Sequence, residues 1–395
     1  MPGGVLLPRV GLQERVLLPR ARLHVLPTRP EDILARVDQP LRVPDRFLVH
    51  GVGGHTRILA DREPRETQLV FSGADLHNPH PMNAIVVREP GPAENLQRAE
   101  LPKPQARPGH VVARVAAAGV NPVDAGNRAD PSWAGIAPPY VVGYEFAGSI
   151  DHLGDGVADL TAGQAVWGLL PVRGTRFGTY AEYVEVEAAC VGSLPPGLSP
   201  TEAAALPLAG STALQLLDRL SLGWGDSLLI HGAAGGVGSL LVQLARMNGI
   251  RIAGSSSAVR HPLLDDLGVE IVLDREHQDV FTQATRRLGG SFDAVADLVG
   301  GDLIARSLSV LREGGSVGAI VGLQGDFEDA IDRNLRLHGV LVRPDRATLD
   351  RLADAVQRGE LRPIVDGVVD PDSIAQAHRR LETGHGQGKI VLRWC

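Results

Sequence analysis

The stretch that decides the fold is Ser227-Leu-Leu-Ile-His-Gly-Ala-Ala-Gly-Gly-Val-Gly238, which continues as Ser239-Leu-Leu-Val-Gln-Leu-Ala-Arg246. It begins with a short apolar run, passes through a turn rich in glycine and ends in a segment whose apolar residues have helical spacing. This order is typical of a buried strand that leads through a tight turn into a helix. We therefore expect a strand over residues 227–230 and a helix over residues 237–248.

The turn between them has the spacing of a dinucleotide-binding fingerprint, Ala233-x-Gly235-x-x-Gly238, with alanine in the first glycine position. Gly235 would let the backbone approach a pyrophosphate, and Gly238 would permit close packing of the helix on the strand. The first N–H groups of the helix and the positive end of its dipole would then face the phosphates. The residues expected to contact the cofactor here are Ala233, Ala234, Gly235, Gly236, Val237 and Gly238. A plain structural turn is the alternative.

Strand-like and helix-like segments alternate downstream of this turn. Further strands are expected at 251–253, 271–273, 294–296 and 316–320, and helices at 262–267, 280–288 and 302–311. Alternation of this kind favours a doubly wound parallel sheet of the α/β class over residues 206–338. Residues 339–395 are expected to hold two helices, 347–358 and 372–381, and a last strand, 389–393.

Residues 82–205 have a different texture. Glycine and proline interrupt this region every few positions, and short apolar runs such as 83–87 and 111–118 lie between them. Frequent turns between short strands favour an irregular β-rich domain. The sequence thus predicts two domains of different architecture.

Residues 1–81 stand apart from the rest of the chain. They contain ten of the 28 prolines and two aromatic residues, Phe47 and Phe71. Prolines at positions 2, 8, 19, 27, 30, 40 and 44 would interrupt a helix before it reaches a stable length. We expect a poorly structured extension, or a mis-assigned start with the working protein beginning at Met82. The alternative is a tail with a partner of unknown kind.

Composition excludes several classes of protein. Hydrophobic residues make up 44% of the chain and charged residues 22%, which rules out wholesale disorder. A formal net charge of -7 without a long basic run argues against nucleic-acid binding. No apolar run approaches the roughly 18 residues that indicate a membrane span. The two cysteines, Cys190 and Cys395, form no CxxC pair, so we expect a reducing, cytoplasmic setting.

The second strand of the expected parallel sheet indicates which dinucleotide binds. An NAD site usually places a carboxylate about 20 residues past the glycines, where it holds the ribose hydroxyls. Here the strand is followed by Gly254-Ser-Ser-Ser-Ala-Val-Arg260, without an acidic residue. Because hydroxyl donors and a cation suit a 2′-phosphate, we expect Ser255, Ser256 and Arg260 to bind NADPH. Alternatively, the serines cap the helix before Pro262 and Arg260 is solvated.

The glycine turn belongs to a longer pattern that resembles a known family. The pattern reads Gly225-Asp226-x-x-Leu229-x-x-x-Ala233-Ala234-Gly235-Gly236-x-Gly238-x-x-x-x-Gln243-x-x-Arg246. The other landmarks, in chain order, are Ala118-Gly119-Val120-Asn121-Pro122-Val123-Asp124, Gly143-Tyr144-Glu145-Phe146-Ala147-Gly148, Gly178-Thr179-Tyr180-Ala181-Glu182-Tyr183, Ser211-Thr212-Ala213, Phe292-Asp293-x-x-x-Asp297-x-x-Gly300-Gly301 and Gly386-x-Gly388-Lys389-x-x-Leu392. Together they resemble the quinone oxidoreductase (zeta-crystallin) branch of the medium-chain dehydrogenases/reductases, over residues 82–395 and none of 1–81.

This resemblance implies a fold and a set of site residues. The fold is a GroES-like catalytic domain made from both chain ends, residues 82–205 and 339–395, around an inserted Rossmann domain, and the assembly is a homodimer. Asn121, Asp124 and Tyr144 would lie near the nicotinamide and the substrate, and Thr212 close to the nicotinamide end. The alternatives are a turn cap for Asp124 and a wall residue of the cleft for Tyr144.

The chain departs from the zinc-dependent members of this family at the positions of two catalytic ligands. Asn121 stands where those members have cysteine, and Tyr144 stands where they have histidine; their four-cysteine structural lobe is also absent from this sequence. Zinc needs about four ligands, so we expect no metal. Without a Lewis acid, hydride transfer from NADPH to a quinone or to an α,β-unsaturated carbonyl is favoured.

The substrate within this class stays open. Many quinone reductases of the family have a tyrosine two residues after the aspartate of the Asn-x-x-Asp motif, where this chain has Gly126. One alternative is an enoyl reductase of a biosynthetic, polyketide-like pathway, and another is a catalytically idle NADPH-binding protein. In either enzymatic case the partner is a small-molecule substrate.

Overall fold

The computed structural model describes residues 81–277, 279–384 and 386–394. These residues form three sheets, of two, six and seven strands. The extension predicted for residues 1–81 lies outside the described residues except for Pro81, which begins the first strand. No helix of the described part is long and apolar enough to cross a membrane.

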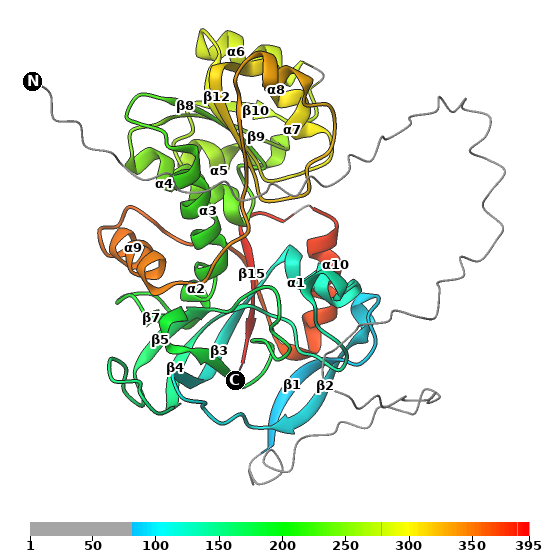
Figure 1. Cartoon of the computed structure of the whole chain (residues 1–395), viewed down its shortest axis with the longest axis vertical. Coiled ribbons are helices and arrows are strands. Elements are labelled where there is room, and N and C mark those ends of the chain that lie inside the picture. Colours follow the sequence, from blue (N-terminus) through cyan, green and yellow to red (C-terminus); the bar gives the residue numbers. More distant parts are fainter. Residues whose placement is uncertain (1–80, 278, 385, 395) are drawn as a thin grey trace, which may run out of the picture. The chain divides into compact units, whose positions relative to one another are not determined.

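The six-stranded sheet is parallel and has the strand order β10-β9-β8-β11-β12-β13. Figure 1 labels β8, β9, β10 and β12 of this sheet in the upper part of the view. Its strands are β8 (Ser227–His231), β9 (Arg251–Ser256), β10 (Ile271–Asp274), β11 (Phe292–Asp297), β12 (Leu311–Ala319) and β13 (Arg336–Gly339). The chain runs outward from β8 through β9 to β10, and outward in the other direction from β11 through β12 to β13. The carboxyl ends of β8 and β11 therefore flank the switch point, which is where ligands bind in such folds. The doubly wound parallel sheet predicted from the sequence is confirmed.

Helices accompany these strands; those between β8 and β12 lie where the sequence predicts them, whereas the helix before β8 and the helix after β12 were not predicted. They are α3 (Pro207–Leu220), α4 (Gly236–Met247), α5 (His261–Asp266), α6 (Val280–Leu288), α7 (Leu303–Arg306) and α8 (Glu328–Asp332). The helix predicted over 302–311 is wrong in its second half, where a 3-10 helix (Ser307–Val310) follows α7. Leu311 already belongs to β12, because it pairs with Phe292 of β11 and both side chains are buried.

The seven-stranded sheet is built from the two parts of the chain that flank the parallel sheet. Its main path is β14-β15-β3-β4-β5-β7, and β6 pairs with β3. The strands are β3 (His110–Val120), β4 (Glu145–Leu153), β5 (Ala165–Leu169), β6 (Tyr183–Glu187), β7 (Val191–Ser193), β14 (Val365–Val369) and β15 (Lys389–Arg393). The GroES-like domain with strands from both parts is confirmed, because β15 lies antiparallel to β3. The domain boundaries 82–205, 206–338 and 339–395 stay a prediction.

A hairpin and four helices complete this second domain. The hairpin pairs β1 (Pro81–Val87) with β2 (Leu96–Pro102), and the N–H of Ile85 donates to the Tyr180 carbonyl at 2.8 Å. The helices are α1 (Pro122–Ala129), α2 (Pro200–Ala203), α9 (Arg346–Gln357) and α10 (Ile374–Glu382). The hairpin therefore holds the segment that carries Tyr180, whose hydroxyl contacts Asp124.

One apolar core is shared by the two larger sheets. Trp167 of β5 belongs to the same buried cluster as Leu216 of α3 and Ile230 of β8. Each of these side chains is 0% exposed, and full burial of a large apolar side chain contributes about 1.5–3 kcal/mol. The core holds α3 against both sheets and so fixes the glycine turn relative to the catalytic domain.

Candidate active site

The glycine turn lies between the end of β8 and the start of α4, at the switch point of the parallel sheet. Gly232 has a φ of +77°, and the helix begins at Gly236 without a side-chain cap. A Cβ on Gly238 would lie 2.2 Å from the Gly232 oxygen, so helix and strand approach more closely than a larger residue allows. The N–H groups of the first helical turn have no partners within the helix, which leaves them for phosphates. Residues 233–238 thus form a turn that can hold a pyrophosphate.

Ser255 and Ser256, predicted to bind a 2′-phosphate, lie at the end of β9, and Arg260 lies just after it. The strand extends three residues beyond the predicted range 251–253. Ser255 is buried, and its hydroxyl is 3.0 Å from His231 Nδ1. Ser256 donates its hydroxyl to the carbonyl of the next residue at 3.2 Å. Arg260 has a pKa lowered by burial and by the charge of Arg275. The structure turns the Ser255 hydroxyl inward and places Ser256 and Arg260 beside a second arginine.

Arg275 is a residue that the sequence analysis missed. It follows β10 directly, and its N–H donates to the Ser256 carbonyl at 2.8 Å. Its side chain is 40% exposed and lies 3.9 Å from Glu276. Two arginines at the ends of neighbouring strands make a corner that favours an anion such as phosphate. The signal in the sequence was a basic residue directly after the third strand of the sheet.

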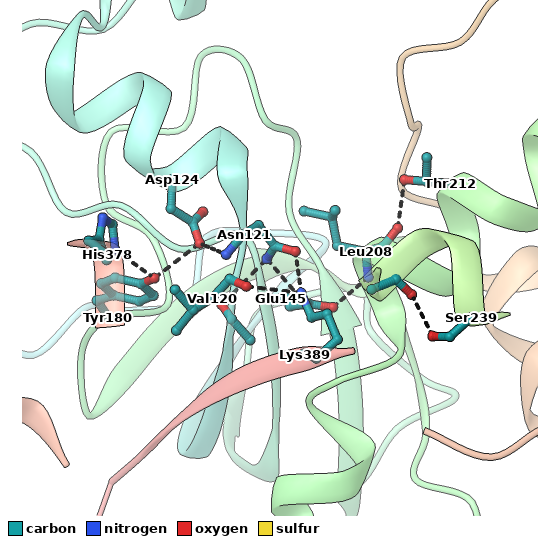
Figure 2. Close-up of polar contacts among 12 residues, drawn as sticks. Val120, Asn121, Asp124, Glu145, Tyr180, Leu208, Thr212, Ser239, His378 and Lys389 are labelled. Atoms are coloured by element: carbon teal, nitrogen blue, oxygen red, sulfur yellow. Dashed lines mark hydrogen bonds and ion pairs between the residues drawn. The ribbon is translucent and has the colours of Figure 1, made fainter. Parts of the chain in front are cut away.

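A buried cluster of ion-paired side chains, the Lys389 cluster, lies where β15, β4 and the start of α1 meet (Figure 2). The Lys389 ammonium donates to Glu145 Oε1 at 2.7 Å, to the Val120 carbonyl at 3.2 Å and to Asn121 Oδ1. Glu145 Oε2 accepts the Leu208 N–H at 2.6 Å. Lys389 is 5% exposed and Glu145 0%. The charges compensate each other, and every ammonium hydrogen has an acceptor, as a buried ion pair requires.

The Lys389 cluster is tied to the glycine turn by the residue before Lys389. The N–H of Gly388 donates to the Ala234 carbonyl at 3.0 Å. A Cβ on Gly236 would lie 2.8 Å from Lys389 Cδ, so this position of the turn favours glycine. Thr212 of α3 is 5% exposed and donates its hydroxyl to the carbonyl four residues earlier at 2.7 Å. The glycine turn and the seven-stranded sheet therefore meet at Gly388 and Lys389, at the start of β15.

Asp124 lies in the first turn of α1 and is completely buried. Its Oδ2 accepts the Asn121 N–H at 2.7 Å and the Tyr180 hydroxyl at 3.0 Å, whereas no described residue hydrogen-bonds its buried Oδ1. Burial raises the pKa of Asp124 to about 7, against the opposing effects of the Asn121 N–H and the Lys389 charge. Asp124 is therefore the helix cap that the sequence left as an alternative, and also a carboxyl group that titrates near neutral pH.

Tyr144 has partners outside the Lys389 cluster. It is completely buried, and its hydroxyl accepts a hydrogen bond from Asn127 Nδ2 at 2.5 Å. Asn127 also donates to the Val172 carbonyl at 3.2 Å. Burial raises the pKa of Tyr144 well above its usual range, so the hydroxyl keeps its proton at neutral pH.

His231 lies at the end of β8 and is 1% exposed. Its two ring nitrogens are each 3.0 Å from a serine hydroxyl, those of Ser255 and Ser307. Burial lowers the pKa of His231 to about 4, so the ring is neutral at neutral pH. The contacts agree with a residue that supports the sheet end.

The residues at the two zinc-ligand positions do not fit a metal ion. Asn121 is hydrogen-bonded to Lys389 and Glu145, whereas Tyr144 is hydrogen-bonded to Asn127. Within the described ranges, no group of three or more His, Cys, Asp or Glu side chains could hold a metal. Because zinc needs about four N, S or O ligands in one place, an amide and a phenol that are each held by other hydrogen bonds do not supply its site.

Two family models match this chain. The one described as an alcohol dehydrogenase GroES-like domain matches residues 107–196. The one described as a zinc-binding dehydrogenase matches residues 267–392. The first match covers most of the seven-stranded sheet, and the second runs from the parallel sheet into β15.

Similar proteins include several reductases. The 2-methylene-furan-3-one reductase of Solanum lycopersicum is 33% identical over 300 residues, which cover 73% of this chain and 73% of that protein. The chloroplastic NADPH-dependent alkenal/one oxidoreductase of Arabidopsis thaliana is 30% identical over 329 residues, 81% of each chain. The solved structure of the quinone oxidoreductase from Coxiella burnetii matches with a TM-score of 0.75 and 32% identity, over 80% of this chain and 100% of that one.

Proposed function

We propose that this chain, which belongs to the quinone oxidoreductase-like branch of the medium-chain dehydrogenases/reductases, is an NADPH-dependent reductase that works without zinc. It transfers a hydride to a quinone or to the β-carbon of an α,β-unsaturated carbonyl. The observation that carries the proposal is the Lys389 cluster, in which Asn121 binds an ammonium group instead of a metal. The names of the two plant relatives support an unsaturated carbonyl as the substrate class.

The chain offers distinct groups to each part of NADPH, which supplies the hydride when bound. Within residues 233–238, the N–H groups of Ala233 and Gly235 donate to backbone carbonyls, so the N–H groups at the start of α4 hold the pyrophosphate. Ser256 and Arg260 bind the 2′-phosphate, with Arg275 as a second cation, and Ser255 supports the end of β9 through His231. Thr212 lies toward the nicotinamide end.

Asn121, Asp124 and Tyr144 line the place where the substrate reacts. Hydride addition to a conjugated carbonyl leaves negative charge on oxygen, which hydrogen-bond donors stabilise and a proton finally neutralises. Burial raises the pKa of Asp124 to about 7, so this carboxyl can hold and release a proton at neutral pH. The Asn121 amide is fixed by Lys389 and Glu145, and Tyr144 keeps its hydroxyl proton as a donor.

A homodimer is proposed from the edge of the parallel sheet. β13 is the last strand in the sheet order and pairs with β12 on one side. Ile331, Leu337 and Leu341, on and beside this strand, are exposed apolar residues. An edge strand with unpaired backbone groups and apolar neighbours favours pairing with a second copy. A cytoplasmic setting is a further part of the proposal and rests on the two cysteines of the sequence, which form no CxxC pair.

The test is NADPH oxidation with quinones, enones and alkenals, enoyl thioesters and, as a control, saturated aldehydes. We expect turnover of enones or quinones in the presence of a strong chelator and none of saturated aldehydes. Turnover confined to enoyl thioesters would favour the biosynthetic alternative. Tight NADPH binding without turnover of any acceptor would refute the enzymatic proposal and leave an idle binding protein.

A further inference from the structure

A row of buried polar side chains leads from Asp124 into the catalytic domain. The Tyr180 hydroxyl is 3.0 Å from Asp124 Oδ2 and 3.1 Å from His378 Nε2 (Figure 2). Arg128 Nη1 is 3.4 Å from His378 Nδ1, and Arg128 Nη2 donates to Glu382 at 2.7 Å. Tyr180 and His378 are 0% exposed and Arg128 is 3% exposed. The row ends at the surface, because the Glu382 side chain is 43% exposed.

The direction of each hydrogen bond in this row follows from its first donor. A guanidinium group only donates, so His378 Nδ1 must accept from Arg128. Burial and the Arg128 charge lower the pKa of His378 to about 3, so the ring is neutral and carries one N–H, on Nε2. That N–H donates to the Tyr180 oxygen. The Tyr180 hydroxyl can therefore donate its hydrogen only to its other partner, Asp124 Oδ2.

This order makes the two oxygens of Asp124 different. Oδ2 receives two donors, the Tyr180 hydroxyl and the Asn121 N–H, whereas Oδ1 is buried and has no partner among the described residues. A proton that binds Asp124 would compete with two donors at Oδ2 and with none at Oδ1. Oδ1 is therefore the oxygen that takes up the proton.

We propose that His378, held by Arg128, is a positioning residue that fixes the Tyr180 hydroxyl on Oδ2 of Asp124 and leaves Oδ1 as the oxygen that exchanges a proton during the reduction. The part about the reduction rests on the proposed function, which gives Asp124 a role near the substrate. The row itself does not carry a proton from the surface, because Arg128 cannot give one up and so interrupts any transfer beyond His378.

Other charged and titratable groups also act on Asp124. Lys389 of β15 lowers its pKa, and Glu145 of β4 raises it. The Tyr144 phenol of the segment before β4 also faces it, because Asp124 is one of the groups that raise the pKa of Tyr144. These groups are left unchanged in variants of Tyr180 and His378, so such variants isolate the contribution of the row.

The direct test measures the protonation of Asp124 by infrared spectroscopy. The carbonyl band of its protonated form is followed across pH and assigned by its loss in Asp124→Asn. We expect the Asp124 pKa to rise by about one to two units in Tyr180→Phe, because a hydrogen bond to a charged group has that strength. His378→Leu should give a smaller rise, and His378→Gln, which can accept from Arg128 and donate to Tyr180, should return the pKa toward the wild-type value.

Arg380→Gln is the matched control, because Arg380 lies on the same helix as His378 but pairs with Asp366 at the surface. This variant should leave the Asp124 pKa unchanged. An Asp124 pKa that is the same in His378→Leu as in the wild type would overturn the proposal and make His378 a packing residue.

A second measurement needs no variant. Nitrogen-15 NMR distinguishes the two tautomers of a neutral histidine, and the proposal requires the hydrogen of His378 on Nε2. A hydrogen on Nδ1, or a protonated ring at neutral pH, would overturn it. The pH dependence of kcat separates the two proposals: if the Asp124 pKa moves in Tyr180→Phe but the kcat profile does not follow, the row stands and the catalytic role of Asp124 fails.

Discussion

Arg260→Ala tests the assignment of NADPH most sharply. Arg260 is 8% exposed and follows β9, where an NAD site would place a carboxylate. Burial and the neighbouring Arg275 both lower its pKa, so two like charges are held together at this corner. A 2′-phosphate carries about -1.5 to -2 charges and would neutralise both. The free protein therefore retains an unfavourable charge arrangement that NADPH relieves and NADH does not.

The size of the expected loss follows from the burial of each arginine. A charge-assisted hydrogen bond contributes about 1.5–3 kcal/mol, and about 1.4 kcal/mol is a tenfold change in affinity. Arg260→Ala should therefore weaken NADPH by roughly ten- to a hundredfold and leave NADH nearly unchanged. The Arg275 side chain is 40% exposed. Because exposed ion pairs contribute at most about 1 kcal/mol, Arg275→Ala should cost no more than about fivefold.

The assay is titration of each variant with NADPH and with NADH, followed by nucleotide fluorescence or calorimetry. Arg286→Ala is the control, because Arg286 is an exposed residue of α6 and is not one of the residues assigned to the phosphate. Damage to the fold would weaken both nucleotides alike. The 2′-phosphate assignment is wrong if the wild type prefers NADH, or if Arg260→Ala leaves the ratio of the two affinities unchanged.

A chain that begins at Met82 should keep its melting temperature and NADPH affinity, since the composition of residues 1–81 predicts little packing; a large loss in thermal unfolding would show otherwise. Turnover should survive strong chelators, and elemental analysis should find no stoichiometric zinc. Lys389→Met should lower the free energy of unfolding in urea by about 3–5 kcal/mol, because it leaves the buried Glu145 carboxylate unpaired, and Lys389→Met with Glu145→Gln should lose less. Burial raises the folded-state pKa of Asp124 from 3.8 to about 7, so the folded chain binds this proton more tightly than the unfolded chain does. The free energy of unfolding should therefore fall as pH rises from about 4 through 7. Urea unfolding of Asp124→Asn should lack this part of the fall.

The sequence predicts the elements whose apolar pattern is local and misses others, among them β13 and β14 at the edges of the sheets and β4 and β5 inside the seven-stranded sheet. β8 is apolar on both faces and stands directly before a glycine turn, so its position is readable from a few residues. β13 was missed because three of its four residues are exposed and one of them is charged, which gives no alternation of polar and apolar side chains. β14 was missed for a similar reason, since its short stretch Val365–Val369 contains an aspartate and a glycine and is only half-buried.

Single residues of the site could likewise be assigned only where the local sequence determines their surroundings. Residues 233–238 could be assigned because turn, strand and helix are adjacent in sequence. The orientation of Ser255 could not, because the strand was expected to end at 253, whereas β9 continues and places Ser255 opposite His231 in the register with β8. Glu145 and Lys389 both stand in recognised motifs, but they are 244 residues apart and only the paired sheet strands bring them together.

The Lys389 cluster places a positive charge beside the buried Glu145 carboxylate. With an amide at position 121, the buried Glu145 carboxylate has no metal charge nearby, and an uncompensated buried carboxylate would cost several kcal/mol. Lys389 supplies the missing positive charge and also binds the Asn121 oxygen. Its neighbour Gly388 donates to the glycine turn. Lys389, which compensates the buried Glu145 carboxylate, is thus next to the contact with the glycine turn, so Lys389→Met should weaken NADPH binding as well as stability.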